Sequence, residues 1–285
     1  MRTVCWLGLM PVVDALSSTA STLSLIKPQH PALHVIHADP PVYVIPNFLS
    51  SSECADLMQA ANACKEIPYE DEVKLRWDRL HLLVPLIAIS STGLVVAGHD
   101  PSEAFGASLG VAVCLVTAAS ALFSFLVEKG ALRCFTGTKW DIDAVNHPFA
   151  ARAASLFGVS TARLEPVTLT RYNAGEYQRQ HLDARPLGDT SGVSEFASSG
   201  GQRLAQVIVY LQAPAAGGET TFHGPAFGGR LAVQPEKGTA LVFPTACMRD
   251  GTPDERYVHC GEPVSGPRAK WIVGSWLMQG ERSPA

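Results

Sequence analysis

The sequence predicts a β-rich α+β fold, with a sandwich or jelly-roll core and flanking helices. After residue 158 the apolar residues alternate with polar ones or form short runs, and Gly and Pro turns separate these runs. Before that point, two amphipathic segments have helical spacing. Between residues 80 and 127 lie two long uncharged segments, which predict an inserted apolar helical hairpin.

The first helix is expected to begin after Ser50. The residues from Ser50 to Glu53 have the spacing of a capping box, and apolar residues recur at helical intervals from Cys54 onward. We expect Pro68 and the acidic run 70–72 to end this helix.

A second amphipathic helix is expected over residues 146–158. Asn146 is a candidate N-cap, Pro148 would lie in the first turn, and Gly158 is the stop signal.

The rest of the chain is expected to form strands. The segments with this pattern are 167–170, 206–211, 231–233, 240–243, 257–258 and 271–277. Several short strands separated by turns are typical of sandwiches and jelly rolls.

Composition narrows the class of protein. The 285 residues suffice for one sizeable core with an appendage, and the net charge of -4 gives no sign of a nucleic-acid partner. The seven cysteines include no C-x-x-C pair, so zinc ribbons and thioredoxin-like chemistry are not supported. We expect most of them to be small buried hydrophobes.

The first 26 residues have a basic residue, an apolar run over 4–13 and a Ser/Thr-rich tract. This is the layout of a short secretory signal, although Pro11 and Asp14 depart from it. A disordered amino terminus is the alternative.

The apolar segments 80–98 and 104–127 are each long enough to cross a bilayer core of about 30 Å. Their flanks are basic and the connection 99–103 is acidic, which by the positive-inside tendency places both flanks in the cytosol. We therefore expect two transmembrane helices. Buried helices of a soluble fold, or sequence that is not native to the domain, are the alternatives.

The second half of the chain contains a candidate metal site. His181 and Asp183 are two residues apart, so in an extended strand they project from the same face. A second imidazole, His259, follows 78 residues later. Two histidines and one carboxylate with open positions are the ligand set of non-haem Fe(II) oxygenases. Another His-x-Asp triplet, 37–39, precedes two prolines, and we interpret it as a turn entry.

Further residues around this triad carry a family resemblance. They are Arg171-Tyr172, Gly175, Gly200-Gly201-Gln202-Arg203, Tyr210-Leu211, Gly217 to Thr220, Phe222, Pro235, Gly238, Ala240-Leu241, Phe243, Asp254 and Lys270-Trp271. In order and approximate spacing this set resembles the prolyl 4-hydroxylase branch of the Fe(II)/2-oxoglutarate dioxygenases. The resemblance runs over residues 163–278, extends weakly to 40–54 and leaves 76–130 uncovered. It implies a double-stranded β-helix whose mouth holds the iron.

The resemblance also implies roles for single residues. His181, Asp183 and His259 would hold Fe(II), and no catalytic residue beyond this iron site is expected. The residues expected on the 2-oxoglutarate side are Lys270, Tyr172 and Thr220, and those expected on the substrate side are Arg203 and Trp276.

The position of the lysine departs from the family pattern. The family usually places it ten residues after the distal histidine, whereas Lys270 is eleven residues after His259 and Arg268 is nine. A one-residue bulge before the strand would accommodate Lys270, and otherwise Arg268 would bind the carboxylate bidentately. We favour Lys270, because Trp271 and Trp276 keep the family's spacing relative to it.

The resemblance implies hydroxylation of prolyl residues in peptides or proteins, with release of succinate and CO2 and with ascorbate rescuing over-oxidised iron. The same chemistry on another peptide residue or a free amino acid is one alternative. A catalytically inactive, membrane-tethered binding module is another. Nucleic acid is not expected as a partner, because basic patches with interleaved aromatics are missing.

The expected organisation has four parts. They are an N-terminal segment with a signal or targeting role (1–35), the first strand and helix of the oxygenase domain (36–75), the inserted hydrophobic hairpin (76–130) and the double-stranded β-helix core (131–285). Membrane association through 80–127 would place the protein in the endoplasmic-reticulum membrane or another endomembrane. The polar segment 184–201 is expected to be a mobile lid over the peptide groove, or a disordered loop.

Overall fold

The computed structural model describes residues 4–6, 26–67, 72–74, 100–103, 105, 107–111, 113, 116, 134–186 and 198–283. The chain divides into two units. The larger consists of Met1–Thr3, Val13–Glu70 and Cys134–Ala285, and the smaller of Val4–Val12 and Asp71–Arg133. Within the smaller unit, β1 (Val4–Trp6) and β5 (Glu72–Lys74) form a parallel pair.

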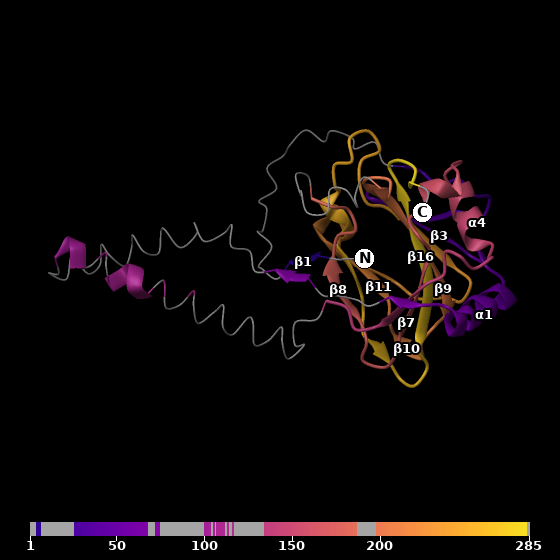
Figure 1. Cartoon of the computed structure of the whole chain (residues 1–285), viewed down its shortest axis with the longest axis horizontal. Helices are drawn as coiled ribbons and strands as arrows, with labels where there is room; N and C mark the ends of the chain where they lie inside the picture. Colours follow the sequence, from indigo (N-terminus) through magenta and orange to yellow (C-terminus); the bar gives the residue numbers. More distant parts are fainter. Residues whose placement is uncertain are drawn as a thin grey trace. The chain divides into compact units, whose positions relative to one another are not determined.

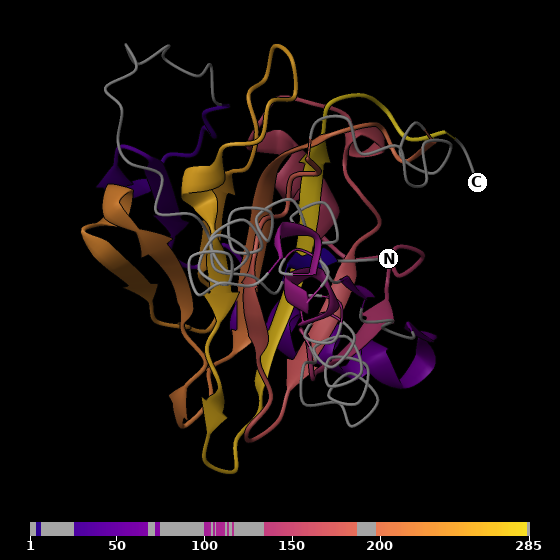
Figure 2. The same ribbon diagram turned by 90° about the vertical axis from the view of Figure 1, so that its left-hand side faces the viewer.

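Two antiparallel sheets form the core of the larger unit. The first has eight strands in the order β2-β3-β13-β9-β16-β7-β6-β4. Their bounds are His34–Ala38 (β2), Pro41–Ile45 (β3), Glu66–Ile67 (β4), Thr138–Asp141 (β6), Thr168–Tyr172 (β7), Arg203–Gln212 (β9), Ala240–Pro244 (β13) and Lys270–Met278 (β16). Figure 2 shows the long strand β16, in yellow, beside β9 and β7.

The second sheet has the order β12-β11-β14-β8. Its strands are β8 (Gln178–His181), β11 (Thr220–Gly224), β12 (Gly229–Val233) and β14 (His259–Gly261). A short antiparallel pair, β10 (Ala216–Gly217) with β15 (Val264–Ser265), adds a ribbon. The β-rich prediction is therefore confirmed, with two large antiparallel sheets and few helices.

Strand β9 separates two cores, because its residues alternate between the faces of the large sheet. Val207, Val209 and Leu211 pack into the cluster on the helix side. Ile208 and Tyr210 belong to a second cluster, which includes Phe222 from the four-stranded sheet. The run of apolar residues in β9 thus follows from burial on both faces.

Helices α1 (Ser51–Ala60) and α4 (Phe149–Ser155) cover the outer face of the large sheet (Figure 1). The predicted capping box is present: the Ser50 hydroxyl accepts from the Glu53 amide at 3.2 Å, and the Glu53 carboxylate accepts from the Ser50 amide at 2.7 Å. Arg152 of α4 donates to the same carboxylate at 2.6 Å, which ties the two helices together.

Several predicted boundaries were wrong for local reasons. A 3-10 turn, Ala61–Ala63, follows α1 and the chain then enters β4, so the first helix ends before Pro68. The second helix begins at Phe149 with Pro148 as its N-cap, and Asn146 does not cap it. The residue before a proline is disfavoured in the helical region, which excludes 146–147 from the helix.

The predicted strand at 257–258 was also wrong, because residues Glu255–Tyr257 form a 3-10 helix. The Asp254 carboxylate accepts from the Arg256 amide at 3.1 Å and caps this turn. Tyr257 is buried, and its hydroxyl donates to the Pro41 carbonyl at 2.9 Å. Burial in this turn, and not in a strand, therefore explains why the apolar residues Tyr257 and Val258 are adjacent.

The triplet 37–39 belongs to no group of metal-ligating side chains formed by the described residues. His37 lies in strand β2, not in the turn itself, and Asp39 follows in the turn, where it forms an ion pair with Arg256 at 2.9 Å.

The expected transmembrane hairpin is not supported. A span needs about 20 continuous helical residues. Several positions between 101 and 116 are helical, yet no helix in the described part of the chain is long and apolar enough to cross a membrane. All of 80–98 and all of 117–127 fall outside the described residues, as do residues 187–197 of the expected lid and most of the expected signal. The endomembrane location stays a prediction.

We predict that Gly238→Ala destabilises the fold more than Gly228→Ala. Both glycines have positive φ, +80° and +63°, so alanine is strained at either position. At Gly238 the added Cβ would also collide with the Leu49 carbonyl oxygen, whereas nothing lies within 4 Å at Gly228. We expect a loss of about 1 kcal/mol for Gly228→Ala and up to about 3 kcal/mol for Gly238→Ala. Urea unfolding measures both, and equal losses would contradict the steric explanation.

Candidate metal centre

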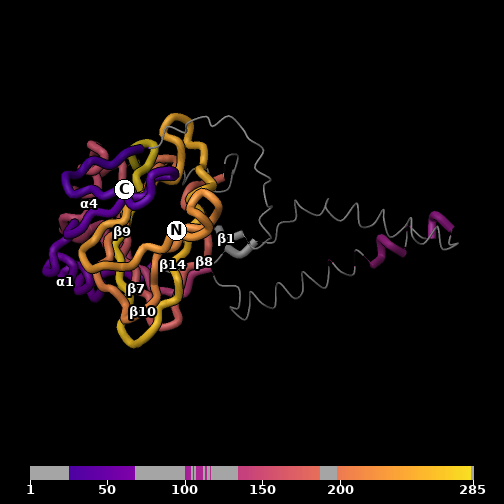
Figure 3. Tube along the Cα trace, turned by 180° about the vertical axis from the view of Figure 1, so that it is seen from behind, coloured from indigo at the N-terminus to yellow at the C-terminus, as the bar shows by residue number. Residues whose placement is uncertain are grey.

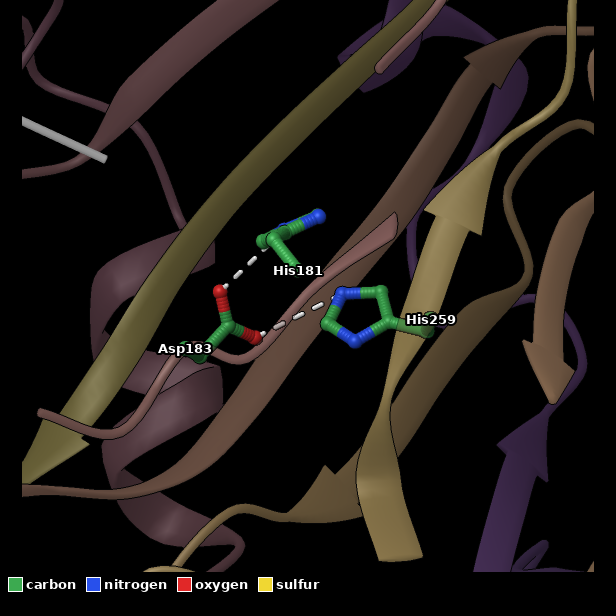
Figure 4. A group of neighbouring side chains, drawn as sticks. All are labelled: His181, Asp183 and His259. Carbon is green, nitrogen blue, oxygen red and sulfur yellow. Dashed lines mark ion pairs between the residues drawn. The ribbon is translucent and has the colours of Figure 1, made fainter. Parts of the chain in front are cut away.

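His181, Asp183 and His259 converge between the two sheets. His181 ends β8 and is paired in the ladder with His259, the first residue of β14. Figure 3 shows β8 and β14 side by side. Asp183 follows two residues after His181 and turns toward both imidazoles (Figure 4). The pairing of two short strands therefore brings together residues that are far apart in sequence.

The ligating atoms are close enough to share one ion. The Nε2 atoms of His181 and His259 each lie 3.6 Å from one Asp183 carboxylate oxygen. One ligand atom from each residue lies within 4.8 Å of the others. The three residues are 7%, 6% and 3% exposed in sequence order, so water screens them little. Such a set fits a metal ion that keeps open positions.

Backbone contacts orient both imidazoles. His181 Nδ1 lies 2.8 Å from the Arg179 carbonyl, and His259 Nδ1 lies 3.0 Å from the Tyr257 carbonyl. Because a carbonyl oxygen only accepts, each Nδ1 carries the hydrogen, and each Nε2 presents its lone pair to the cluster. Within the described residues, Asp183 Oδ2 has no hydrogen-bond partner, which leaves it available to a cation.

The protonation states also suit a metal. Burial opposes ionisation of Asp183, but the neighbouring imidazoles of His259 and His181 hold the pKa of its carboxyl below the usual range. Burial and the neighbouring His181 lower the pKa of His259 to about 4. At neutral pH the aspartate is ionised and His259 is neutral, and metal ligands must have these forms.

Gln178 occupies the position in front of His181, and the sequence analysis missed it. Its side-chain amide donates to His181 Nε2 at 3.0 Å, and its carbonyl accepts from the Tyr172 hydroxyl at 3.2 Å. Strand alternation would place residues 178 and 181 on opposite faces. A register shift between β14 and β8 changes this placement, and no pattern in the sequence marks it.

Lys270 lies in the same cavity, opposite Tyr172 in the ladder. It is 3% exposed, and burial lowers its pKa to about 8. Its Nζ lies 5.4 Å and 5.5 Å from the ring centroids of Tyr172 and Tyr210. Thr220 also lines the cavity and accepts a hydrogen bond from the Tyr210 hydroxyl at 2.9 Å, so its own hydroxyl hydrogen can donate elsewhere. An anion would find an ammonium and a hydroxyl together here.

Arg268 is placed differently: its guanidinium donates to the Pro214 carbonyl at 3.0 Å, and it does not line this cavity. The ladder between β16 and β9 has an irregularity between Trp271 and Ile272, one residue after Lys270 rather than before the strand. The geometry therefore favours Lys270 as the anion-binding residue.

Trp276 lines the cavity, whereas Arg203 does not line it and contacts the Trp276 ring. The Arg203 guanidinium lies 3.9 Å from the centroid of the Trp276 ring. It donates twice to the Glu165 carboxylate, at 2.6 Å and 2.7 Å, and once to the Asp183 carbonyl at 3.5 Å. The sequence analysis missed Glu165, because a single acidic residue before a strand carries no signal.

The cavity is narrow, with a volume of about 50 Å³, and both sheets line it. Lys139 and Gln206, which the sequence analysis also missed, contribute from the large sheet. A larger pocket of about 510 Å³ lies beside α1 and α4, where Glu53 and Arg152 are already paired. The metal ligands, the lysine and the tryptophan meet only in the narrow cavity among the pockets of the described residues.

Comparison with known proteins gives relatives for this region. Residues 167–278 match the family described as the 2OG-Fe(II) oxygenase superfamily. The chain is 32% identical over 125 residues to prolyl 4-hydroxylase 1 of Arabidopsis thaliana, which covers 40% of this chain and 41% of that protein. It is 28% identical over 139 residues to prolyl 4-hydroxylase subunit alpha-2 of Caenorhabditis elegans, which covers 49% and 24%.

A solved structure of a viral collagen prolyl hydroxylase from Paramecium bursaria Chlorella virus-1 is 21% identical, with a TM-score of 0.42, and covers 82% of this chain and 93% of that chain. The chain spans less than half the length of the curated relatives that it matches. The predicted resemblance to prolyl 4-hydroxylase-like 2-oxoglutarate oxygenases is confirmed by the family match and by the curated relatives.

We predict that His181→Ala weakens the binding of Mn(II), a stable substitute for Fe(II), by at least about tenfold, because it removes one of three ligands. His34→Ala is the matched control, since His34 is exposed on β2 and distant in the fold from the cluster. Isothermal titration calorimetry measures both affinities. Equal Mn(II) affinity in the two variants would exclude this cluster as the metal centre.

Proposed function

We propose that this chain, whose residues 167–278 match the 2OG-Fe(II) oxygenase superfamily, is an Fe(II)- and 2-oxoglutarate-dependent dioxygenase that hydroxylates prolyl residues in peptides or proteins. One observation carries the proposal: a buried two-histidine, one-carboxylate cluster shares a cavity with the buried cation of Lys270. The names of the matched relatives support prolyl substrates.

His181, Asp183 and His259 would hold the iron. Their Nδ1 contacts to backbone carbonyls fix both rings, so the ligand atoms are preorganised. Three positions on the metal are left for exogenous ligands. When bound, Fe(II) supplies the activation of O2 that couples oxidation of 2-oxoglutarate to succinate and CO2 with hydroxylation of a C–H bond.

Lys270 would bind the far carboxylate of 2-oxoglutarate. Its ammonium is buried between two tyrosine rings, and a charge-assisted hydrogen bond in such a site is strong. Thr220 can donate its hydroxyl to the same carboxylate, because Tyr210 already occupies its acceptor side. Tyr172 donates to the Gln178 carbonyl in the cavity, and its phenol would contact the cosubstrate if Gln178 moved aside.

Trp276 would contact the substrate, since its ring faces the cavity and suits a pyrrolidine ring. Arg203 acts through Trp276 and through the Asp183 carbonyl, and Glu165 fixes the guanidinium in this position. Ascorbate would serve to restore the iron after uncoupled turnover. The inactive-module alternative is disfavoured by the complete ligand set and the buried lysine.

The experiment that tests the function is succinate release by the Fe(II)-loaded chain, with a proline-rich peptide and with the same peptide carrying alanine at each proline. We expect peptide-stimulated release only with proline, and no release by His181→Ala. Stimulation by both peptides would assign another residue as the substrate. No stimulation by any peptide or free amino acid, in an iron-loaded protein, would contradict the oxygenase assignment.

In the same assay we predict that Lys270→Ala raises the KM for 2-oxoglutarate. Loss of a charged hydrogen bond costs about 1.5–3 kcal/mol, or roughly 10- to 100-fold in KM. A high concentration of 2-oxoglutarate should restore turnover. Arg268→Ala is the control and should leave the KM unchanged, because Arg268 contacts the Pro214 carbonyl outside the cavity. The reverse pattern would assign the carboxylate to Arg268.

We also predict a pH dependence of 2-oxoglutarate binding. Burial lowers the pKa of Lys270 to about 8, so the free enzyme loses this charge as the pH rises from 7 to 9. The KM for 2-oxoglutarate should therefore increase over this interval in the wild type. In Lys270→Arg, whose guanidinium stays charged, the increase should vanish. A parallel rise in both proteins would assign the effect to another group.

A further inference from the structure

A second group of metal-ligating side chains lies on β11 and β14. His223, Cys260 and Glu262 each offer a ligand atom, and these atoms lie within 4.8 Å of one another. Cys260 is 7% exposed, whereas His223 and Glu262 are half-buried. None of the three has a role in the proposed oxygenase reaction.

The ladder places this group on the opposite face of the small sheet from the His181 cluster. Phe222 pairs with His259 and Thr221 pairs with Cys260. Paired residues share a face and successive residues alternate, so Cys260 and His223 point away from the face that carries His259. The side chains of the two groups therefore project from opposite faces of β14, and Cys260 also borders the cavity of the His181 cluster.

The contacts within the group are those of an assembled ligand set. His223 Nε2 lies 3.3 Å from Cys260 Sγ, and a Glu262 carboxylate oxygen lies within 4.8 Å of both atoms. In a tetrahedral zinc site with bond lengths of about 2.3 Å to sulfur and about 2.0 Å to nitrogen, the sulfur and nitrogen atoms are about 3.5 Å apart. The His223–Cys260 pair is therefore within a few tenths of an ångström of the separation that an ion needs.

Among the described residues, Arg230 is the cation that hydrogen-bonds to this group. It donates to Glu262 at 3.3 Å and to Thr221 at 3.5 Å. Its side chain is 54% exposed, so the guanidinium can withdraw into water at little cost. Arg230 therefore positions the Glu262 carboxylate and still leaves the three ligand atoms accessible to an ion.

We propose that His223, Cys260 and Glu262 form a second metal site, which binds Zn(II) or another divalent ion of similar preference, with water in the fourth position. Thiolate and imidazole together favour this class of ion over Fe(II), Mg(II) or Ca(II). On binding, the Cys260 thiol proton passes to solvent and a sulfur–metal bond forms, so no oxidant or reductant is needed. The ion would connect β11 to β14, the strand that begins with His259.

Co(II) titration of the full chain tests this site, because only a thiolate ligand gives the near-ultraviolet sulfur-to-cobalt absorption band. We expect two equivalents of Co(II) per chain, one of which produces the band. Cys260→Ser should abolish the band, and His223→Ala and Glu262→Gln should each weaken its formation by at least about tenfold. These last two positions are half-buried, so their variants are expected to fold.

Two controls separate this proposal from the proposed function. His181→Ala should no longer bind Co(II) at the His181 cluster but should still produce the absorption band. The titration therefore tests each site independently of the other. Cys64→Ser, at a half-buried free cysteine, should keep both equivalents. A single equivalent without a band, or a band that persists in Cys260→Ser, would overturn the second site.

Discussion

The pairing of β8 with β14 is the constraint on which the centre depends. Each strand is short, yet the ladder sets His181 directly opposite His259, and their ring centroids lie 4.3 Å apart. Two buried imidazoles at this separation would be unfavourable if both were charged. Both rings instead present their Nε2 atoms to the ionised Asp183 and donate from Nδ1 to backbone carbonyls, so the polar atoms of this buried pair have partners and the cluster carries the negative charge that a cation would neutralise.

The two sheets contribute different parts of the chemistry. The four-stranded sheet and the loop after it supply the metal ligands, whose positions depend on short strands. Strands β7, β9 and β16 of the eight-stranded sheet supply Tyr172, Gln206, Lys270 and Trp276 from a wall that is packed on its other face against α1 and α4. A cosubstrate and a substrate would thus be positioned by the sheet that the two helices support.

The sequence predicted those features that follow from local periodicity or from motif spacing. The strand expected at 206–211 and the capping box of α1 are of the first kind, and the convergence of His181, Asp183 and His259 is of the second. The register of strand pairing could not be predicted from the sequence. The choice between Lys270 and Arg268 therefore required the structure, in which Lys270 pairs with Tyr172. Gln178 and Glu165 act through single tertiary contacts, which no spacing encodes. For the hairpin expected over 80–127, no helix in the described part of the chain is long and apolar enough to span a membrane, and residues 80–98 lie outside that part.

Gln178 links the metal ligands to the anion-binding wall. Its amide donates to His181 Nε2 at 3.0 Å, and its carbonyl accepts from the Tyr172 hydroxyl at 3.2 Å. Gln178 lies in the four-stranded sheet and Tyr172 in the eight-stranded sheet, so this one side chain bridges the two sheets at the cavity. The spacing of the sheets at this point therefore depends on a polar bridge as well as on apolar packing.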